Sequence, residues 1–300
     1  MGRQVQQAYP LRLGWPVAFP EDPPAHEASG SIVVMDSGSA FTPSVLEMWR
    51  KRENLLPGLV LIAFAAAGWA YVAYQAASMG SMRSGVGVLA MGGVEGIVSF
   101  LFGWTVMTVA MMVPATVPLI LLYRHLSRKR LSPARAQVGM LALLAGYVTV
   151  WVSAGLPVYA YALFAEKAGS LATVLPALLL VVGGAYQFTP LKRICHIRCS
   201  SPLFFLMQKW RPGATGALRL GVLHGIDCLG CCAGLMVGLV ALGMMNLVWM
   251  LTAAVVIFVE KTIPNSHRVA RTLGVVMVVG GIVLLGASLL GGIAPGMKSM

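Results

Sequence analysis

Seven stretches of the chain are apolar and close to the ~20 residues that a helix needs to cross a lipid bilayer. They cover roughly residues 55–77, 97–123, 138–165, 171–189, 219–243, 246–263 and 269–291. The composition agrees, because 58% of the residues are hydrophobic, 11% are charged, and the mean hydropathy is +0.79. The fourth stretch is the least regular, since Pro176 and the pair Gly183-Gly184 interrupt it. We predict an all-α fold, a polytopic membrane helical bundle with about seven transmembrane helices.

Basic residues gather in alternate connections between these stretches. They precede the first stretch and follow the second, fourth and sixth: Arg50, Lys51 and Arg52; Arg124, Arg128, Lys129, Arg130 and Arg135; Lys192, Arg193, Arg198, Lys209, Arg211 and Arg219; Lys261, His267, Arg268 and Arg271. Cytoplasmic loops carry such an excess of Lys and Arg, so we predict a cytoplasmic N-terminus and a C-terminus on the opposite side. Basic loops that face the anionic headgroups of a bilayer also explain the net charge of +12 without a nucleic-acid partner.

Two regions differ in composition. Residues 1–45 are mixed in charge, contain Pro, Gly and Ser, and show no apolar period, which predicts a flexible cytoplasmic N-terminal tail. Residues 46–300 are expected to form the transmembrane helical domain, with a Cys-containing cytoplasmic loop at 190–218.

The fifth stretch carries the residues with the most distinctive chemistry. Within nine residues it contains His224, Asp227, Cys228, Cys231 and Cys232. On a helix the imidazole and the three thiols fall within an arc of roughly 100°, and Asp227 lies at its edge. Such a donor set is typical of a site for Cu(I), with zinc as the alternative. The competing interpretation is that the cysteines pack as small apolar residues.

Two methionines in the second stretch favour copper over zinc. Met107 and Met111 share a helix face with Trp104 and Pro114, whereas Met112 points elsewhere on a regular helix. Thioethers bind Cu(I) well and zinc poorly, although paired methionines are also common core filler. We expect the second and fifth stretches to pack directly, with the methionines near Cys231 or Cys232, and Pro114 to kink its helix.

The cytoplasmic loop offers a further pair of thiols. Cys195 and Cys199 are four residues apart, with His196 between them, and Pro190 is well placed to begin a short helix that stacks both thiols on one face. The reducing cytoplasm disfavours a disulfide, so the pair is a candidate for metal binding. The residues alone leave open whether it shares one site with the fifth stretch.

Carboxylates and glycines bear on how such a site is held. Glu260 closes the sixth stretch beside Lys261, where an interfacial ion pair or a role in orienting His224 are the alternatives. Asp227 is the second carboxylate that could orient ligands. The residues Gly230, Gly234 and Gly238 recur every four positions and predict close approach of a neighbouring helix.

Several motifs in the same order resemble a bacterial family of predicted metal-binding integral membrane proteins. They are W-x2-M-x3-MM-x-P, YQFTPLK-x3-C-x3-C, HG-x2-CLGCC-x3-LM and VEK-x2-P, within about residues 97–264. The resemblance implies a multi-pass protein of the bacterial inner membrane, with matching positions at Met107, Met111, Met112, Cys195, Cys199, His224, Cys228, Cys231, Cys232 and Glu260. The chain departs from the pattern at Asp227, His196 and Ser200, and Asp227 would make a site harder or more proton-coupled.

Three functions follow from these observations. The first is copper handling or transfer in the membrane, with a metal donor protein or other membrane subunits as partners. The second is a subunit of a metal-dependent monooxygenase or oxidoreductase, for which the chain offers few His or carboxylate ligands. The third is a metal-free scaffold subunit that uses small-residue helix faces as contacts. Whether the protein is an enzyme stays open.

Overall fold

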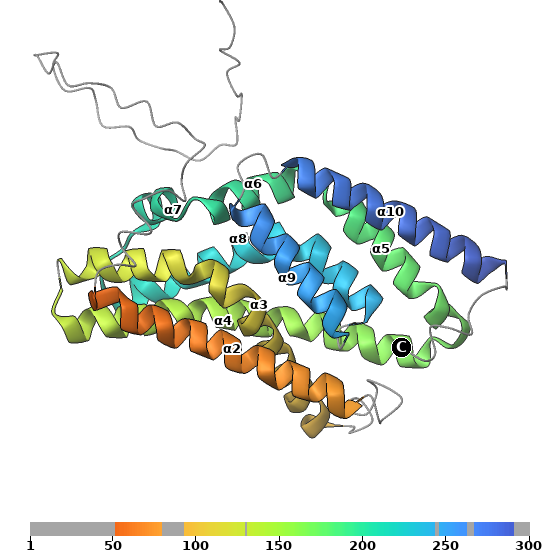
Figure 1. Ribbon diagram of the computed structural model, residues 1–300, viewed down its shortest axis with the longest axis horizontal. Helices are drawn as coiled ribbons and strands as arrows, with labels where there is room; N and C mark the ends of the chain where they lie inside the picture. Colours follow the sequence, from red (N-terminus) through yellow and green to blue (C-terminus); the bar gives the residue numbers. More distant parts are fainter. Residues whose placement is uncertain (1–51, 80–92, 130, 244–245, 263–266, 291–300) are drawn as a thin grey trace, which may run out of the picture. The chain divides into compact units, whose positions relative to one another are not determined.

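The computed structural model describes residues 52–79, 93–129, 131–243, 246–262 and 267–290, all within one compact unit formed by residues 37–300. The elements in chain order are α2 (Arg52–Met79), α3 (Val94–Arg128), α4 (Pro133–Lys167), the 3-10 helix η1 (Gly169–Thr173), α5 (Leu175–Tyr186), α6 (Pro190–Ser200), α7 (Pro202–Lys209), α8 (Gly213–Leu242), α9 (Leu247–Thr262) and α10 (His267–Leu289) (Figure 1). Regular structure in these ranges is entirely helical, so the all-α prediction is confirmed. The expected tail, residues 1–45, lies outside the described residues.

Five of the described helices are long and apolar enough to cross a membrane: α2, α3, α4, α8 and α10. A sixth crossing exists if residues 171–186 and α6, which meet at a bend of 67°, count as one broken span. The described residues thus contain five or six candidate spans, against the about seven expected from the sequence. The expected sixth span is α9, whose 16 residues rise only about 24 Å, less than the ~30 Å hydrocarbon core. The chain is a multi-pass membrane protein, and the side on which each terminus lies stays a prediction.

Helix α8 lies between neighbours that approach it through glycines. On one side, a methyl group on Gly221 would overlap the backbone oxygen of Leu143 in α4. On the other, a Cβ on Gly234 would lie 2.6 Å from the backbone oxygen of Gly183 in α5. Small residues allow this close approach in membranes. The predicted close approach at the spaced glycines of α8 is therefore present, with α5 at Gly234 and with α6 at Gly230.

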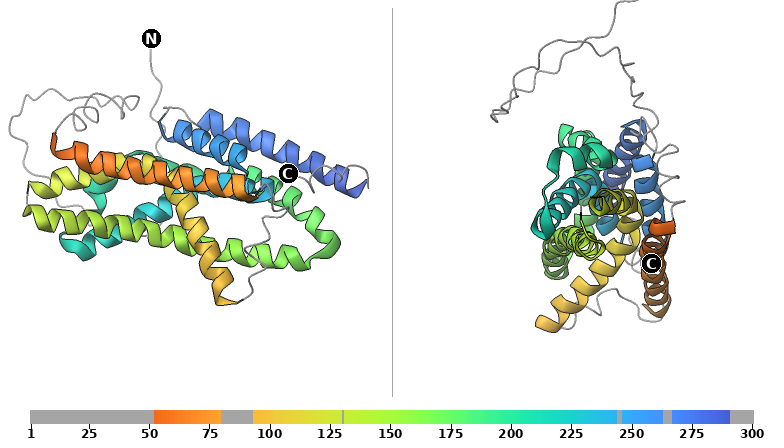
Figure 2. Two further views of the ribbon diagram at one scale, coloured as in Figure 1. Left: turned by 60° about the horizontal axis from the view of Figure 1, so that its bottom comes forward. Right: turned by 90° about the vertical axis from the view of Figure 1, so that its left-hand side faces the viewer.

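The long helix α3 is bent in its middle, as Figure 2 shows. Pro114 and Pro118 lie inside it, and each lacks the N–H that would bond to the preceding turn. The Thr116 hydroxyl donates to the backbone oxygen of Met112 over 3.0 Å in the same region. The kink predicted at Pro114 is therefore present, and it shapes the helix that carries Met107 and Met111.

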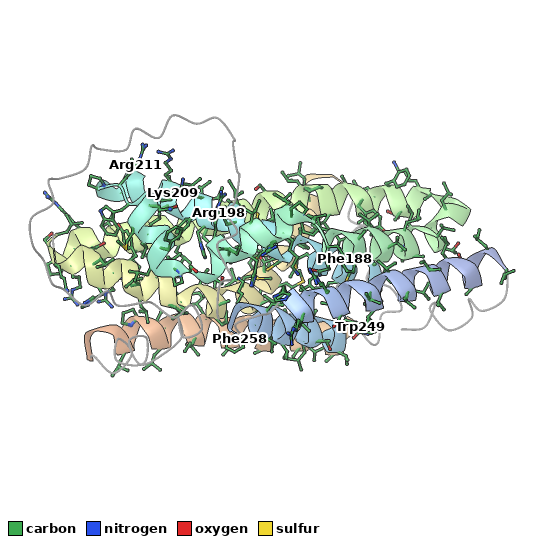
Figure 3. The ribbon with its side chains drawn as sticks, turned by 90° about the horizontal axis from the view of Figure 1, so that it is seen from above. Phe188, Arg198, Lys209, Arg211, Trp249 and Phe258 are labelled. Atoms are coloured by element: carbon green, nitrogen blue, oxygen red, sulfur yellow. The ribbon has the colours of Figure 1, made fainter. Side chains whose placement is uncertain are left out.

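The outer surface of the bundle is apolar over much of its area, while one end is basic. Phe188, Trp249 and Phe258 lie on the outside, and Val276 is 61% exposed. Figure 3 shows Arg198, Lys209 and Arg211 gathered around α6 and α7. An exposed apolar surface of this kind fits contact with lipid acyl chains.

Candidate metal centre

Three cysteine sulfurs from two helices converge inside the bundle. Cys199 of α6 and Cys228 and Cys231 of α8 have ligand atoms that all lie within 4.8 Å of one another. All three are buried free thiols. Because thiolates are the strongest soft donors among side chains, three of them in so small a volume can hold a soft ion such as Cu(I). We call Cys199, Cys228 and Cys231 the three-sulfur site.

Helix α6 brings Cys199 to this position. The helix begins at Pro190, as predicted, and the Thr189 side chain caps it by accepting a hydrogen bond from the backbone N–H of Lys192 over 3.4 Å. Cys195 and Cys199 share the buried face, but only Cys199 belongs to the three-sulfur site. Cys195 fills the notch over Gly230, where an added Cβ would lie 2.6 Å from its sulfur. The structure thus separates the two loop cysteines: Cys199 lies with Cys228 and Cys231, and Cys195 lies over Gly230, while the role of each as a metal ligand stays a prediction.

Cys232 lies beside the site, because its sulfur is 3.4 Å from that of Cys231. Cys231 in turn donates to the backbone oxygen of Cys228 over 3.1 Å. The spacing predicted that Cys232 shares one helix face with His224, Cys228 and Cys231. In the structure it is adjacent to the three-sulfur site and is not one of its members.

Two further residues contact the Cys228 sulfur. Lys261 Nζ, from the end of α9, donates to it over 3.1 Å, and the Tyr147 hydroxyl of α4 lies 3.2 Å from it. Sequence reasoning placed Lys261 at the membrane interface and did not single out Tyr147. A tyrosine within an apolar helix gives no signal of its partner, because only the packing of α4 on α8 brings the two residues together.

Glu260 has a different partner from those expected. Its two carboxylate oxygens each accept from Lys192 Nζ over 3.0 Å, and both side chains are 5% exposed. Lys192 also donates to Gln187 Oε1. From the sequence, Glu260 was expected to pair with Lys261 or to orient His224. Among the described residues, no hydrogen bond or ion pair joins Glu260 to either residue. Instead, the pair ties α6 to α9.

His224 lies one helical turn before Cys228 and is buried, with 2% of its surface exposed. Its ring stacks on Tyr147 at a centroid distance of 5.8 Å and meets the edge of Phe205 at 5.3 Å. Within the described part of the chain, its Nδ1 atom has no hydrogen-bond partner. His224 is thus next to the three-sulfur site and has a donor atom available, so its role as a ligand stays a prediction.

Asp227 forms an ion pair with a cation of α6. Its Oδ1 atom lies 3.8 Å from a guanidinium nitrogen of Arg198, whose side chain is 60% exposed. The distance is long and the arginine is exposed to solvent, and ion pairs of this kind contribute little to stability. The proposed hardening of the site by Asp227 therefore has no direct contact to act through.

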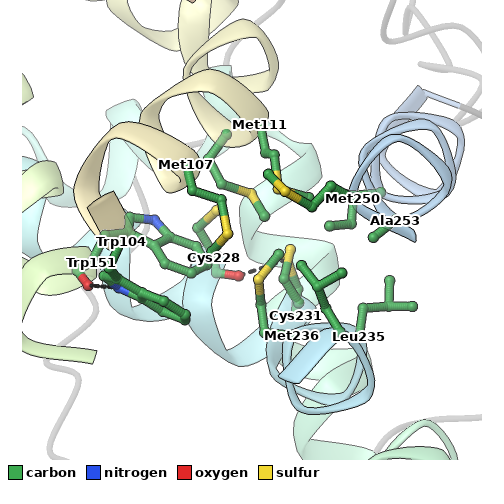
Figure 4. Packing of buried hydrophobic residues seen from close by; sticks show 14 of the residues in the cluster. Trp104, Met107, Met111, Trp151, Cys228, Cys231, Leu235, Met236, Met250 and Ala253 are labelled. Atoms are coloured by element: carbon green, nitrogen blue, oxygen red, sulfur yellow. Dashed lines mark hydrogen bonds between the residues drawn. The ribbon is translucent and has the colours of Figure 1, made fainter. Parts of the chain in front are cut away.

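The methionines of α3 reach the same buried cluster as the cysteines. Figure 4 shows Met107 and Met111 extending from α3 toward the face of α8 that carries Cys228 and Cys231. Met112 also belongs to this cluster and is fully buried, although a regular helix would point it elsewhere. Helix α8 packs mainly on α4, α5 and α6, and α3 mainly on α2 and α4, so α3 and α8 meet through the side chains of this cluster more than along their backbones.

The geometry has a counterpart among known proteins. Residues 101–284 match the model of the family PpoB2, described as a copper chaperone. The chain belongs to this copper chaperone family. The match includes every cysteine of the chain, together with His224, Met107 and Met111. No curated protein and no solved structure matches the chain.

Membership of the copper chaperone family identifies the metal that the sulfur donors suggested. Copper, carried as cargo, agrees with three buried cysteines between helices, and the zinc alternative loses its support. The resemblance to metal-binding membrane proteins is confirmed in its broad part: a copper-handling family, and several candidate membrane helices.

Proposed function

We propose that the protein holds Cu(I) on Cys199, Cys228 and Cys231 and passes it on from a site in the cytoplasmic half of the bacterial inner membrane. The observation that carries this proposal is the convergence of three sulfurs from α6 and α8 within 4.8 Å in a member of a copper chaperone family. Thiolates favour Cu(I) over harder ions, and burial excludes the water that would compete for coordination. The depth follows from the basic connection that precedes α8.

The partners in this proposal are the lipid bilayer, a metal donor protein and a client that receives copper. Ligand exchange between thiol sites moves Cu(I) without a change of oxidation state, so neither partner has to supply electrons. Cys199 lies on α6, the short helix that also carries the exposed Arg198, and is therefore the donor best placed to meet an incoming carrier.

The two other functions considered from the sequence receive less support. A monooxygenase or oxidoreductase subunit would use the same metal with an open position and harder ligands, yet Asp227 and Glu260 are engaged with Arg198 and Lys192. A metal-free scaffold has no use for three convergent thiols. Redox assays with an electron donor on the copper-loaded protein test the former, and metal analysis tests the latter.

The decisive experiment is a Cu(I) titration of reduced protein in detergent against a chromogenic Cu(I) chelator. Single Cys→Ser variants at positions 199, 228 and 231 should each weaken binding by more than about tenfold, or ~1.4 kcal/mol. The matched control is Cys195→Ser, which changes a buried thiol of the same helix that packs on Gly230. Equal losses in all four variants, or no copper bound by the unaltered protein, would contradict the proposal.

A further inference from the structure

A second group of sulfurs lies beside the three-sulfur site. Met236 of α8 and Met250 of α9 are buried, at 4% and 1% exposure, in the same cluster as the cysteines and as Met107 and Met111 of α3. Figure 4 shows Met107, Met111 and Met250 extending from their helices toward the face of α8 that carries Met236. Three helices thus contribute thioethers to one buried volume.

Met236 and Met250 lie further toward the end of α8 than the cysteines do. Met236 follows Cys228 by eight residues, a rise of about 12 Å along the helix. Helix α9 runs back alongside α8, because its last turn brings Lys261 to Cys228. Met250 is eleven residues before Lys261, about 16 Å back along α9, and so lies beside the second half of α8. Along α8, Lys261 and the thiols therefore come first and Met236 and Met250 follow, while Met107 and Met111 extend from α3 toward the same buried cluster.

The change from thiol to thioether alters how the ion is held. Thioethers are neutral soft ligands that bind Cu(I) without deprotonation, whereas cysteine must lose a proton to bind a metal. An ion bound by thioethers therefore keeps its positive charge and is held less tightly. A chaperone must release its cargo, and ligands of decreasing strength in sequence allow release without one large step.

We propose that Met107, Met111, Met236 and Met250 form a second Cu(I) site, a thioether site that exchanges the ion with the three-sulfur site. The inference rests on the proposed function, since the cysteines must first hold the ion. In the exchange, Cu–thiolate bonds break as Cu–thioether bonds form, the ion stays Cu(I), and the freed thiolates take up protons from solvent or remain paired with Lys261. The same four residues with no metal role would be ordinary core filler.

The test compares Met236→Leu combined with Met250→Leu against Met140→Leu. Leucine has a similar volume and no sulfur, so the substitution preserves packing at small cost. Met140 is a matched control, because it is a buried methionine, 7% exposed, in the separate core cluster of α3, α4, α7 and α8. Each purified, reduced protein is titrated with Cu(I), and Cu–S distances are measured by X-ray absorption at one and at two equivalents.

The unaltered protein and the Met140 variant should bind two ions, the second more weakly and with the longer Cu–S distances of thioethers. The double variant should bind one ion only, and it should release that ion to a chelator several-fold more slowly. Two ions in the double variant, or one ion in the unaltered protein, would overturn the thioether site while leaving the cysteine site intact. No bound copper in any of the three proteins would overturn the proposed function as well. Unchanged thermal unfolding of the double variant ensures that lost binding is not lost fold.

Discussion

Lys261 Nζ donates to Cys228 Sγ over 3.1 Å, so a cationic side chain is in direct contact with the three-sulfur site. A cluster of thiolates with one monovalent ion carries excess negative charge, which is costly at membrane depth unless it is compensated. A charge-assisted hydrogen bond of this kind is worth roughly 1.5–3 kcal/mol.

Replacing Lys261 by Leu should therefore weaken Cu(I) binding by about tenfold to a hundredfold, because the charge is lost and no sulfur ligand is added. Lys261→Arg retains the charge and should lie between the variant and the unaltered protein. Competition with a Cu(I) chelator measures all three. Equal affinities for the unaltered protein and Lys261→Leu would show that the contact has no role in holding copper.

Removing one member of the buried pair Lys192–Glu260 should destabilise the bundle strongly. Glu260→Gln leaves the ammonium of Lys192 buried without its counter-charge, at a cost of roughly 3–5 kcal/mol. The double change Lys192→Met with Glu260→Gln removes the buried charge and should recover much of that loss. Thermal unfolding in detergent gives the comparison, and a double variant less stable than Glu260→Gln would refute the assignment.

His224 should matter for copper, but less than the cysteines. Cys228→Ser with Cys231→Ser should abolish binding and leave the helices in the membrane, since apolar spans insert without metal. His224→Phe should weaken binding moderately if its free Nδ1 is a ligand, and Met112→Leu should have the least effect. Copper retained in full by the cysteine double variant would move the site elsewhere.

Topology is open to a direct test with reporter tags. A tag on the C-terminus should report the periplasmic side, and one between Arg128 and Arg135 the cytoplasm, because basic connections alternate. The return of α9 to the level of Cys228 supports this prediction, since α10 then starts on the side where α8 starts. Both tags on one side would show that the chain crosses the membrane an even number of times between them, which contradicts the prediction.

Local patterns in the sequence predicted what depends on one segment at a time. The helical class, the start of α6 at Pro190, the bend at Pro114 and the cysteine stripe of α8 all follow from spacing and residue type. The short length of α9 did not follow, since an apolar run does not reveal where its helix begins and ends.

Contacts between distant segments were beyond such patterns. Only one of the two loop cysteines, Cys199, lies at the three-sulfur site, and this depends on how α6 crosses α8 at Gly230. Likewise, Lys192 is one of several basic residues in its connection, and its burial against Glu260 becomes visible only when α6 and α9 are packed. The role of Tyr147 depends on the crossing of α4 and α8.

The glycine contacts of α8 determine how two of the three sulfurs are held. Neither Gly221 nor Gly234 leaves room for a methyl group against α4 or α5, so α8 cannot slide or turn without breaking those contacts. Cys199 comes from another helix, α6, which the buried Lys192–Glu260 pair ties to α9. The separation between Cys199 and the two sulfurs of α8 therefore depends on contacts that contain none of the three cysteines.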